Sequence, residues 1–93
     1  MKTLLERARR GECLDDLEIV DMHGHFGRYL QAVPDRSAAG LVRVMDRLGV
    51  RSLLVSHIQC TSIHARRGND EVLAAMRAFP GRILGYVIVS PVE

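Results

Sequence analysis

Residues 17–27 have the sequence LEIVDMHGHFG, which contains the clearest structural pattern in the chain. Successive side chains of a strand point to opposite faces, so a strand over 17–23 would separate its odd and even positions. The odd positions are Ile19, Asp21, His23 and His25, and the even positions are Val20 and Met22. We expect the apolar even face to pack on helices and the odd face to become polar toward the strand end. Gly24 and Gly27 should then loosen the chain into a loop.

Downstream of this strand, the hydrophobic pattern predicts a helix and then a second strand. Asp35 or Ser37 is a suitable N-cap for the helix, and Gly49 can end it. The apolar residues with helical spacing are Leu41, Val44, Met45 and Leu48. Residues 51–58, RSLLVSHI, have the length and composition of a strand that is buried on both faces.

A second helix and a third strand are predicted after a polar loop over 59–68. Asn69 is the predicted cap of the helix, and Pro80-Gly81 ends it. The apolar side of this helix comprises Val72, Leu73, Met76 and Phe79. Residues 83–89, ILGYVIV, form the predicted third strand, and we expect Tyr86 and Met76 in the core.

The N-terminal segment predicts a short helix over 4–10, because Thr3 and Glu6 have capping-box spacing and Gly11 can end the helix. The predicted order is a helix followed by β-α-β-α-β, which indicates an α/β fold with a parallel sheet. We divide the single domain into an N-terminal helix and linker, residues 1–16, and an α/β part, residues 17–93. Three strands with two helices leave sheet edges and apolar surface uncovered, so we expect the architecture to be incomplete.

Composition and charge exclude several classes of protein. The chain is 47% apolar and 26% charged, as in soluble globular proteins, and contains no apolar run near the roughly 20 residues that span a bilayer. Its first residues lack the apolar stretch of a signal peptide. The net charge is only +2, and the doublets Arg9-Arg10 and Arg66-Arg67 have no interleaved aromatics, which argues against nucleic acid as a partner. We expect a cytoplasmic protein that does not associate with membranes.

His23 and His25 are the best candidates for metal ligands. Two imidazoles two residues apart at a strand end would point the same way and could reach one metal at roughly 2.0–2.1 Å. In parallel α/β folds, sites form at the C-terminal ends of the strands. An arbitrary H-x-H is usually a pair of solvated histidines. Here the pair follows a buried strand and Asp21 lies two residues before His23, and both features favour a metal site.

With these residues the chain resembles the amidohydrolase superfamily, in particular its amidohydrolase-related group. IVDMHGHFG resembles the family's first strand with its Asp-x-His-x-His signature, and LVRVMDRLGVRSLLVS resembles its first helix and second strand. NDEVLAAMRAFPGRILGYVIVSP resembles its second helix and third strand. The resemblance implies a partial (β/α)8 TIM barrel. Because a complete barrel needs about 250 residues, it also implies an N-terminal fragment.

The resemblance further implies a metal-dependent hydrolase. In that family a divalent metal, most often zinc, with manganese or iron as alternatives, activates water or polarises the substrate. The first-strand histidines are two of its ligands, and the others, with an acid–base Asp, follow strands five, six and eight. We therefore assign only His23 and His25 and expect the 93 residues alone to be inactive. The implied reaction is hydrolysis of an amide, ester or lactone in a small-molecule substrate, by a protein that could form a homo-oligomer.

Three further positions have open roles. Asp21 either orients a ligand imidazole or is a buried Asp that the backbone satisfies. His57 ends the second strand and could contact substrate, although a polar residue with no catalytic role is the more common case. The same holds for Cys60 and His64 in the following loop. Cys13 and Cys60 form no spaced motif and are expected to be free thiols.

Several alternatives remain open from the sequence. Metal-dependent decarboxylases belong to the same superfamily. TatD-like nucleases and phosphoesterases of the polymerase-and-histidinol-phosphatase type also begin with a first-strand H-x-H, but Val89-Ser90-Pro91 lacks the His that TatD-like proteins usually have before this Pro. A non-catalytic α/β module is a further alternative. A self-contained zinc site of His23, His25, His57 and Cys60 fits no compact zinc module.

Overall fold

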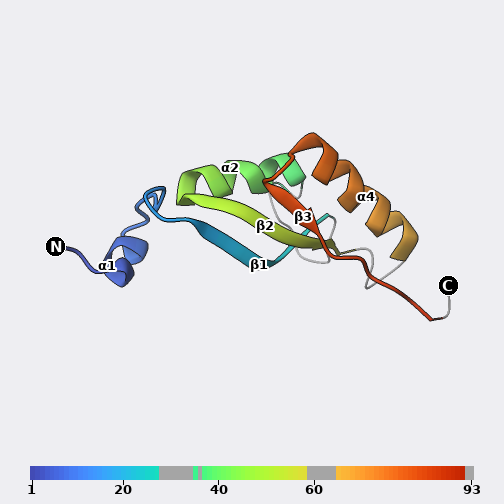
Figure 1. The fold of residues 1–93 in the computed structure, drawn as a ribbon, viewed down its shortest axis with the longest axis horizontal. Coiled ribbons are helices and arrows are strands. Elements are labelled where there is room, and N and C mark those ends of the chain that lie inside the picture. Colours follow the sequence, from blue (N-terminus) through green and yellow to red (C-terminus); the bar gives the residue numbers. More distant parts are fainter. Residues whose placement is uncertain (28–34, 36, 59–64, 92–93) are drawn as a thin grey trace.

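In the computed structural model, three parallel strands alternate with helices (Figure 1). The structure describes residues 1–27, 35, 37–58 and 65–91. The elements are α1 (Leu4–Arg9), β1 (Ile19–Phe26), α2 (Ala38–Leu48), β2 (Val50–His57), α4 (Ala65–Ala78) and β3 (Ile83–Gly85). The sheet has the order β1-β2-β3, both pairs are parallel, and it is not closed. The predicted α/β class and the predicted order of elements are confirmed.

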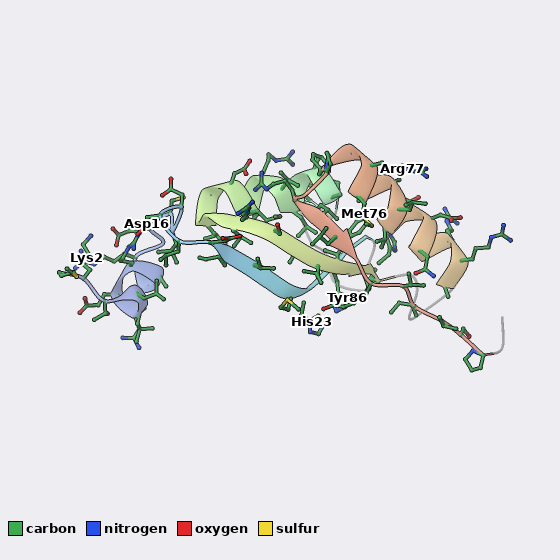
Figure 2. The ribbon with its side chains drawn as sticks, viewed as in Figure 1. Lys2, Asp16, His23, Met76, Arg77 and Tyr86 are labelled. Atoms are coloured by element: carbon green, nitrogen blue, oxygen red, sulfur yellow. The ribbon has the colours of Figure 1, made fainter. Side chains whose placement is uncertain are left out.

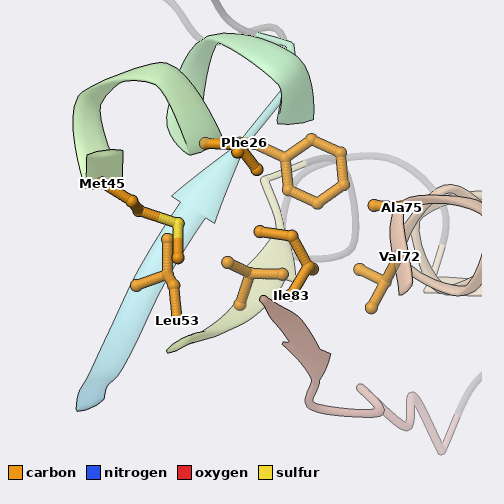
Figure 3. Packing of buried hydrophobic residues seen from close by; sticks show 8 residues of the cluster. Phe26, Met45, Leu53, Val72, Ala75 and Ile83 are labelled. Carbon is orange, nitrogen blue, oxygen red and sulfur yellow. The ribbon is translucent and has the colours of Figure 1, made fainter. Parts of the chain in front are cut away.

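Both helices of the α/β part cover the same face of the sheet. α2 packs on β2, and α4 packs on β2 and β3, so helices and strands form two layers (Figure 1). The core lies between these layers, and Val55 and Ile83 are its most deeply buried side chains (Figure 3). Its other members are Phe26, Val42, Met45, Leu53, Val72 and Ala75. The two layers bury apolar area on one side of the sheet only.

The opposite face of the sheet, which we call the open face, is not covered by any helix in the described ranges. Val20, Met22 and Leu84 remain 44%, 60% and 38% exposed there. Our expectation that Val20 and Met22 pack on helices is therefore wrong. The strands bury the residues of the other face, among them Leu53 and Val55, against α2 and α4.

The helices bury somewhat different residues from those predicted. In α2, Val42 and Met45 are buried and Ala38 and Leu41 pack beside them, whereas Val44 and Leu48 stay exposed. This stripe still has helical spacing, but it begins at Ala38 and is rotated from the predicted one. The caps were predicted correctly. The Ser37 side chain accepts a hydrogen bond from the Gly40 N–H, and Gly49 ends the helix with φ 82°.

α4 begins at Ala65, five residues before the start at Asp70 that an Asn69 cap predicts, and Asn69 lies inside the helix. The Asn69 side chain makes two hydrogen bonds to the Ile88 backbone, donating to its carbonyl at 2.8 Å and accepting from its N–H at 3.1 Å. β3 ends at Gly85 and not at Val89 as predicted. Asn69 occupies the polar groups of Ile88 that a longer strand would offer to a neighbour. The Tyr86 N–H continues the ladder beyond Gly85, donating to the Val55 carbonyl at 2.8 Å.

The N-terminal helix lies beyond the end of the sheet and buries no side chain (Figure 1). Its predicted capping box is present: the Thr3 hydroxyl accepts from the Glu6 N–H, and the Glu6 carboxylate accepts from the Thr3 N–H. Arg7 binds Asp16 in the linker at 2.6 Å. Across the described residues, no helix has the length and apolar character needed to cross a membrane.

Candidate metal centre

The candidate site is formed by an irregular stretch of β1. Asp21 pairs with Leu53 and Gly24 pairs with Val55, so three steps along β1 match two steps along β2. Met22 and His23 together therefore stand opposite the single residue Leu54. Such a bulge bends a strand and re-aims its side chains, and bulges are common beside functional sites. β1 continues beyond it to Phe26, so His25 lies within the strand and not in the loop we predicted.

A compensating shift between Ile19 and Val20 changes which residues share a face. Val20 pairs with Ser52 and Asp21 pairs with Leu53, although regular pairing from Ile19 would have aligned Asp21 with Ser52. A slip of one residue moves side chains to the other face of a sheet. The predicted shared face of Asp21 and His25 is therefore wrong, because Asp21 aligns with Leu53 on the helix-covered face and His25 aligns with Ser56 on the open face.

His23 and His25 lie side by side with their outer ring nitrogens converging. The two Nε2 atoms are 3.0 Å apart, and the rings meet edge to face with centroids 4.9 Å apart. Figure 2 shows His23 on the side of the sheet away from the helices. If both nitrogens bound one metal at about 2.05 Å, their separation would correspond to an angle of about 94° at the metal. Two ligands of a four- to six-coordinate ion can adopt that angle, so the pair fits a divalent metal.

Ser56 of β2 holds the inner ring nitrogen of His25. The distance from His25 Nδ1 to Ser56 Oγ is 2.9 Å, and Ser56 is only 6% exposed. When Nδ1 donates its proton to Oγ, the Nε2 lone pair of His25 is free to bind a metal. Such an outer hydrogen bond is the usual partner of a metal-ligating His. We did not predict a role for Ser56. The sequence contained a signal for it, because Ser52 and Ser56 are four residues apart on β2 and therefore place their hydroxyls on the same face.

Asp21 contacts the backbone and not an imidazole. Its Oδ1 accepts a hydrogen bond from the His23 N–H at 3.0 Å, and the residue is exposed. Of the two predicted roles, the structure thus contains the bond to the backbone, but without the predicted burial. The carboxylate acts within the bulge, where the His23 amide has no partner residue in the strand register.

Tyr86 lies on the open face and not in the core as we predicted. It is 41% exposed, and its hydroxyl donates a hydrogen bond to the Met22 carbonyl at 2.8 Å. The side chain therefore reaches from the end of β3 to β1, and Figure 2 shows it on the same side of the sheet as His23. Met76 is partly buried against the core, as predicted.

His57 lies apart from the two other histidines. It pairs with Phe26 in the register, so it belongs to the helix-covered face, where its ring packs edge to face on Phe26 at 4.9 Å. His57 and Glu71 line a hollow of about 370 Å³ between β2 and the helices. Burial lowers the pKa of His57, the charge of Glu71 opposes this shift, and the charge of Arg67 adds to it. Contact of His57 with substrate stays a prediction, but the register separates its ring from the His23–His25 pair.

The described residues provide two candidate ligands and not a complete site. Within 1–27, 35, 37–58 and 65–91, no group of three or more His, Cys, Asp or Glu residues could hold a metal ion. Cys60 and His64 lie outside the described residues, with the rest of 59–64. The predicted loop extended to residue 68, and this is wrong for 65–68, which belong to α4. Two exposed imidazoles with converging nitrogens can bind a metal weakly by themselves, and a catalytic zinc generally has three protein ligands.

Comparisons with known proteins identify no relative of this chain. No family model, no curated protein and no solved structure matches it. The functional argument therefore depends on the residues and their geometry.

Proposed function

We propose that this chain forms the N-terminal part of a metal-dependent hydrolase of the amidohydrolase superfamily, in which His23 and His25 bind one divalent metal, most simply zinc. The observation that supports this proposal best is the convergence of the two Nε2 atoms at 3.0 Å on the open face of a parallel sheet. The pair lies toward the C-terminal end of β1, where parallel α/β folds form their active sites.

The strand order and the position of the helices support a partial (β/α)8 barrel. A barrel places sequential parallel strands side by side with all helices outside, whereas a doubly wound sheet has helices on both faces. Here β1, β2 and β3 are adjacent in sequence order, and α2 and α4 share one face. Aliphatic side chains fill the interior of such barrels, and the exposed Val20 and Leu84 of the open face suit that position.

In the proposed site, each residue of this chain has a definite task. His23 and His25 present their Nε2 lone pairs to the metal, and Ser56 keeps the proton of His25 on Nδ1. A metal held there supplies an activated water or a polarised carbonyl at neutral pH. The reaction we favour is hydrolysis of an amide, ester or lactone in a small molecule. Decarboxylation would use the same two ligands, so an assay must include both reactions.

The test is the metal content of the full-length protein and of its histidine variants. We expect His23→Ala and His25→Ala each to lose most of the bound zinc, measured by elemental analysis after dialysis against a weak chelator. His57→Gln is the matched control, since that ring lies on the other face, and it should keep the metal. Equal metal content in all four proteins would refute the proposal. With metal loaded, hydrolysis and decarboxylation substrates then identify the reaction.

A further inference from the structure

One peptide bond in the bulge of β1 is held at both of its polar ends by side chains. This is the peptide that joins Met22 to His23, and neither residue has a partner in the strand register. Its N–H donates to Asp21 Oδ1 at 3.0 Å, and its carbonyl accepts from the Tyr86 hydroxyl at 2.8 Å. The two side chains thus satisfy both polar groups of a peptide whose residues have no partner in the strand register.

The orientation of this peptide sets the direction of the His23 side chain. His25 is held by Ser56 through its ring, but among the described residues the only hydrogen bond of the His23 ring is to His25 itself. Rotation of the Met22–His23 peptide plane would turn the Cα–Cβ bond of His23 and move its Nε2 away from that of His25. In a bulge, where the ladder does not fix the plane, another restraint is needed to keep the two nitrogens convergent.

We propose that Asp21 and Tyr86 are positioning residues that together clamp the Met22–His23 peptide and so aim His23 at the metal. Neither side chain touches the metal or the substrate in this role. The inference depends on the proposed function for its purpose, but not for its geometry, because both hydrogen bonds join groups of this chain alone. Tyr86 comes from the end of β3 and Asp21 from β1, so the clamp also couples the first and third strands across β2.

The clamp is tested first without metal, by hydrogen exchange of the His23 amide in the full-length protein. Asp21→Ala removes its acceptor, and we expect exchange about fivefold faster, the loss of one ordinary hydrogen bond. Tyr86→Phe keeps the ring and removes only the hydroxyl at the far end of the peptide. If the two ends act as one clamp, Tyr86→Phe should also speed exchange of the His23 amide. The Leu53 amide, which donates to the Arg82 carbonyl at 2.8 Å, serves as the reference for global stability.

Two control variants make this result specific. Asp21→Asn retains a side-chain oxygen that can accept from the His23 N–H, and it should restore most of the protection. Ser52→Ala removes a different hydroxyl from the same sheet, the one that donates to the Gly81 carbonyl, and should leave the His23 amide unchanged. An exchange rate of the His23 amide in Tyr86→Phe equal to that of the wild type would overturn the clamp. An equal acceleration of the His23 and Leu53 amides would overturn it as well.

The second measurement uses cobalt(II) as the probe and reports on the aim of His23. We expect Tyr86→Phe and Asp21→Ala each to weaken cobalt binding roughly tenfold, as outer partners of metal ligands do, and to change the visible absorption of the bound ion. Unchanged affinity and absorption in Tyr86→Phe would overturn the proposed effect on the metal. If the wild-type protein binds no cobalt, the proposed function fails, and the exchange experiment still decides whether the clamp exists.

Discussion

Replacing Ser56 with alanine tests whether an outer hydrogen bond sets the metal affinity of His25. Ser56 Oγ lies 2.9 Å from His25 Nδ1, and Ser56 is 6% exposed, so water does not easily take the place of the hydroxyl. A hydrogen bond of this kind contributes about 1–1.5 kcal/mol. Since about 1.4 kcal/mol corresponds to a factor of ten, we expect Ser56→Ala to raise the zinc Kd about tenfold.

Ser52 provides a matched control on the same strand. Ser52 is 8% exposed, and its hydroxyl donates to the Gly81 carbonyl at 2.7 Å and not to a histidine. Ser52→Ala and Ser56→Ala should each lower the free energy of unfolding by about 1 kcal/mol. Only Ser56→Ala should weaken zinc binding, and we would measure this by competition with a chelating dye alongside urea denaturation.

Two results would refute this reasoning. An unchanged zinc Kd in Ser56→Ala would show that Ser56 does not hold His25 in its binding form. An equal rise in both variants would show that the loss of affinity follows from general destabilisation of β2. Ser56→Thr, which keeps the hydroxyl, should bind zinc more tightly than Ser56→Ala.

Two further predictions concern the helix-covered face. Because the folded-state pKa of His57 is lowered, the unfolded chain binds more protons below about pH 6.5, so stability should fall as the pH drops through 6.5 toward that lowered pKa. His57→Gln should flatten this part of the pH dependence in urea melts, and an identical pH profile would contradict it. Gly27 has φ +98°, and a Cβ there would lie 2.3 Å from the His57 ring, so Gly27→Ala should cost about 2 kcal/mol or more. Gly11→Ala, at φ +69° with no atom within 4 Å of its Cβ, should cost only about 1 kcal/mol, and equal losses in calorimetry would contradict the predicted collision.

The sequence by itself was sufficient for the class and order of the elements. Alternation in the first strand, two continuous apolar runs of strand length, helical spacing between them, and local end signals such as Thr3, Ser37 and Gly49 predicted the α/β class and most boundaries. These signals act over a few residues, so the sequence shows them directly. The H-x-H pair was also visible, because it is local in the chain. That the two rings bind a metal stays a prediction.

The tertiary structure decided which face each side chain occupies and which distant residues meet. The two register shifts in β1 put Asp21 out of phase with His25, and pairing with β2 produces such shifts, which no local pattern reveals. Hydrogen bonds between residues far apart in sequence, between His25 and Ser56 and between Tyr86 and Met22, likewise arise only when three strands align. Val20 and Met22 of β1 stay exposed, because α2 and α4 both pack on the other face of the sheet. The physical reason is the same in each case: a short-range pattern specifies an element, but its partners are fixed by packing between elements.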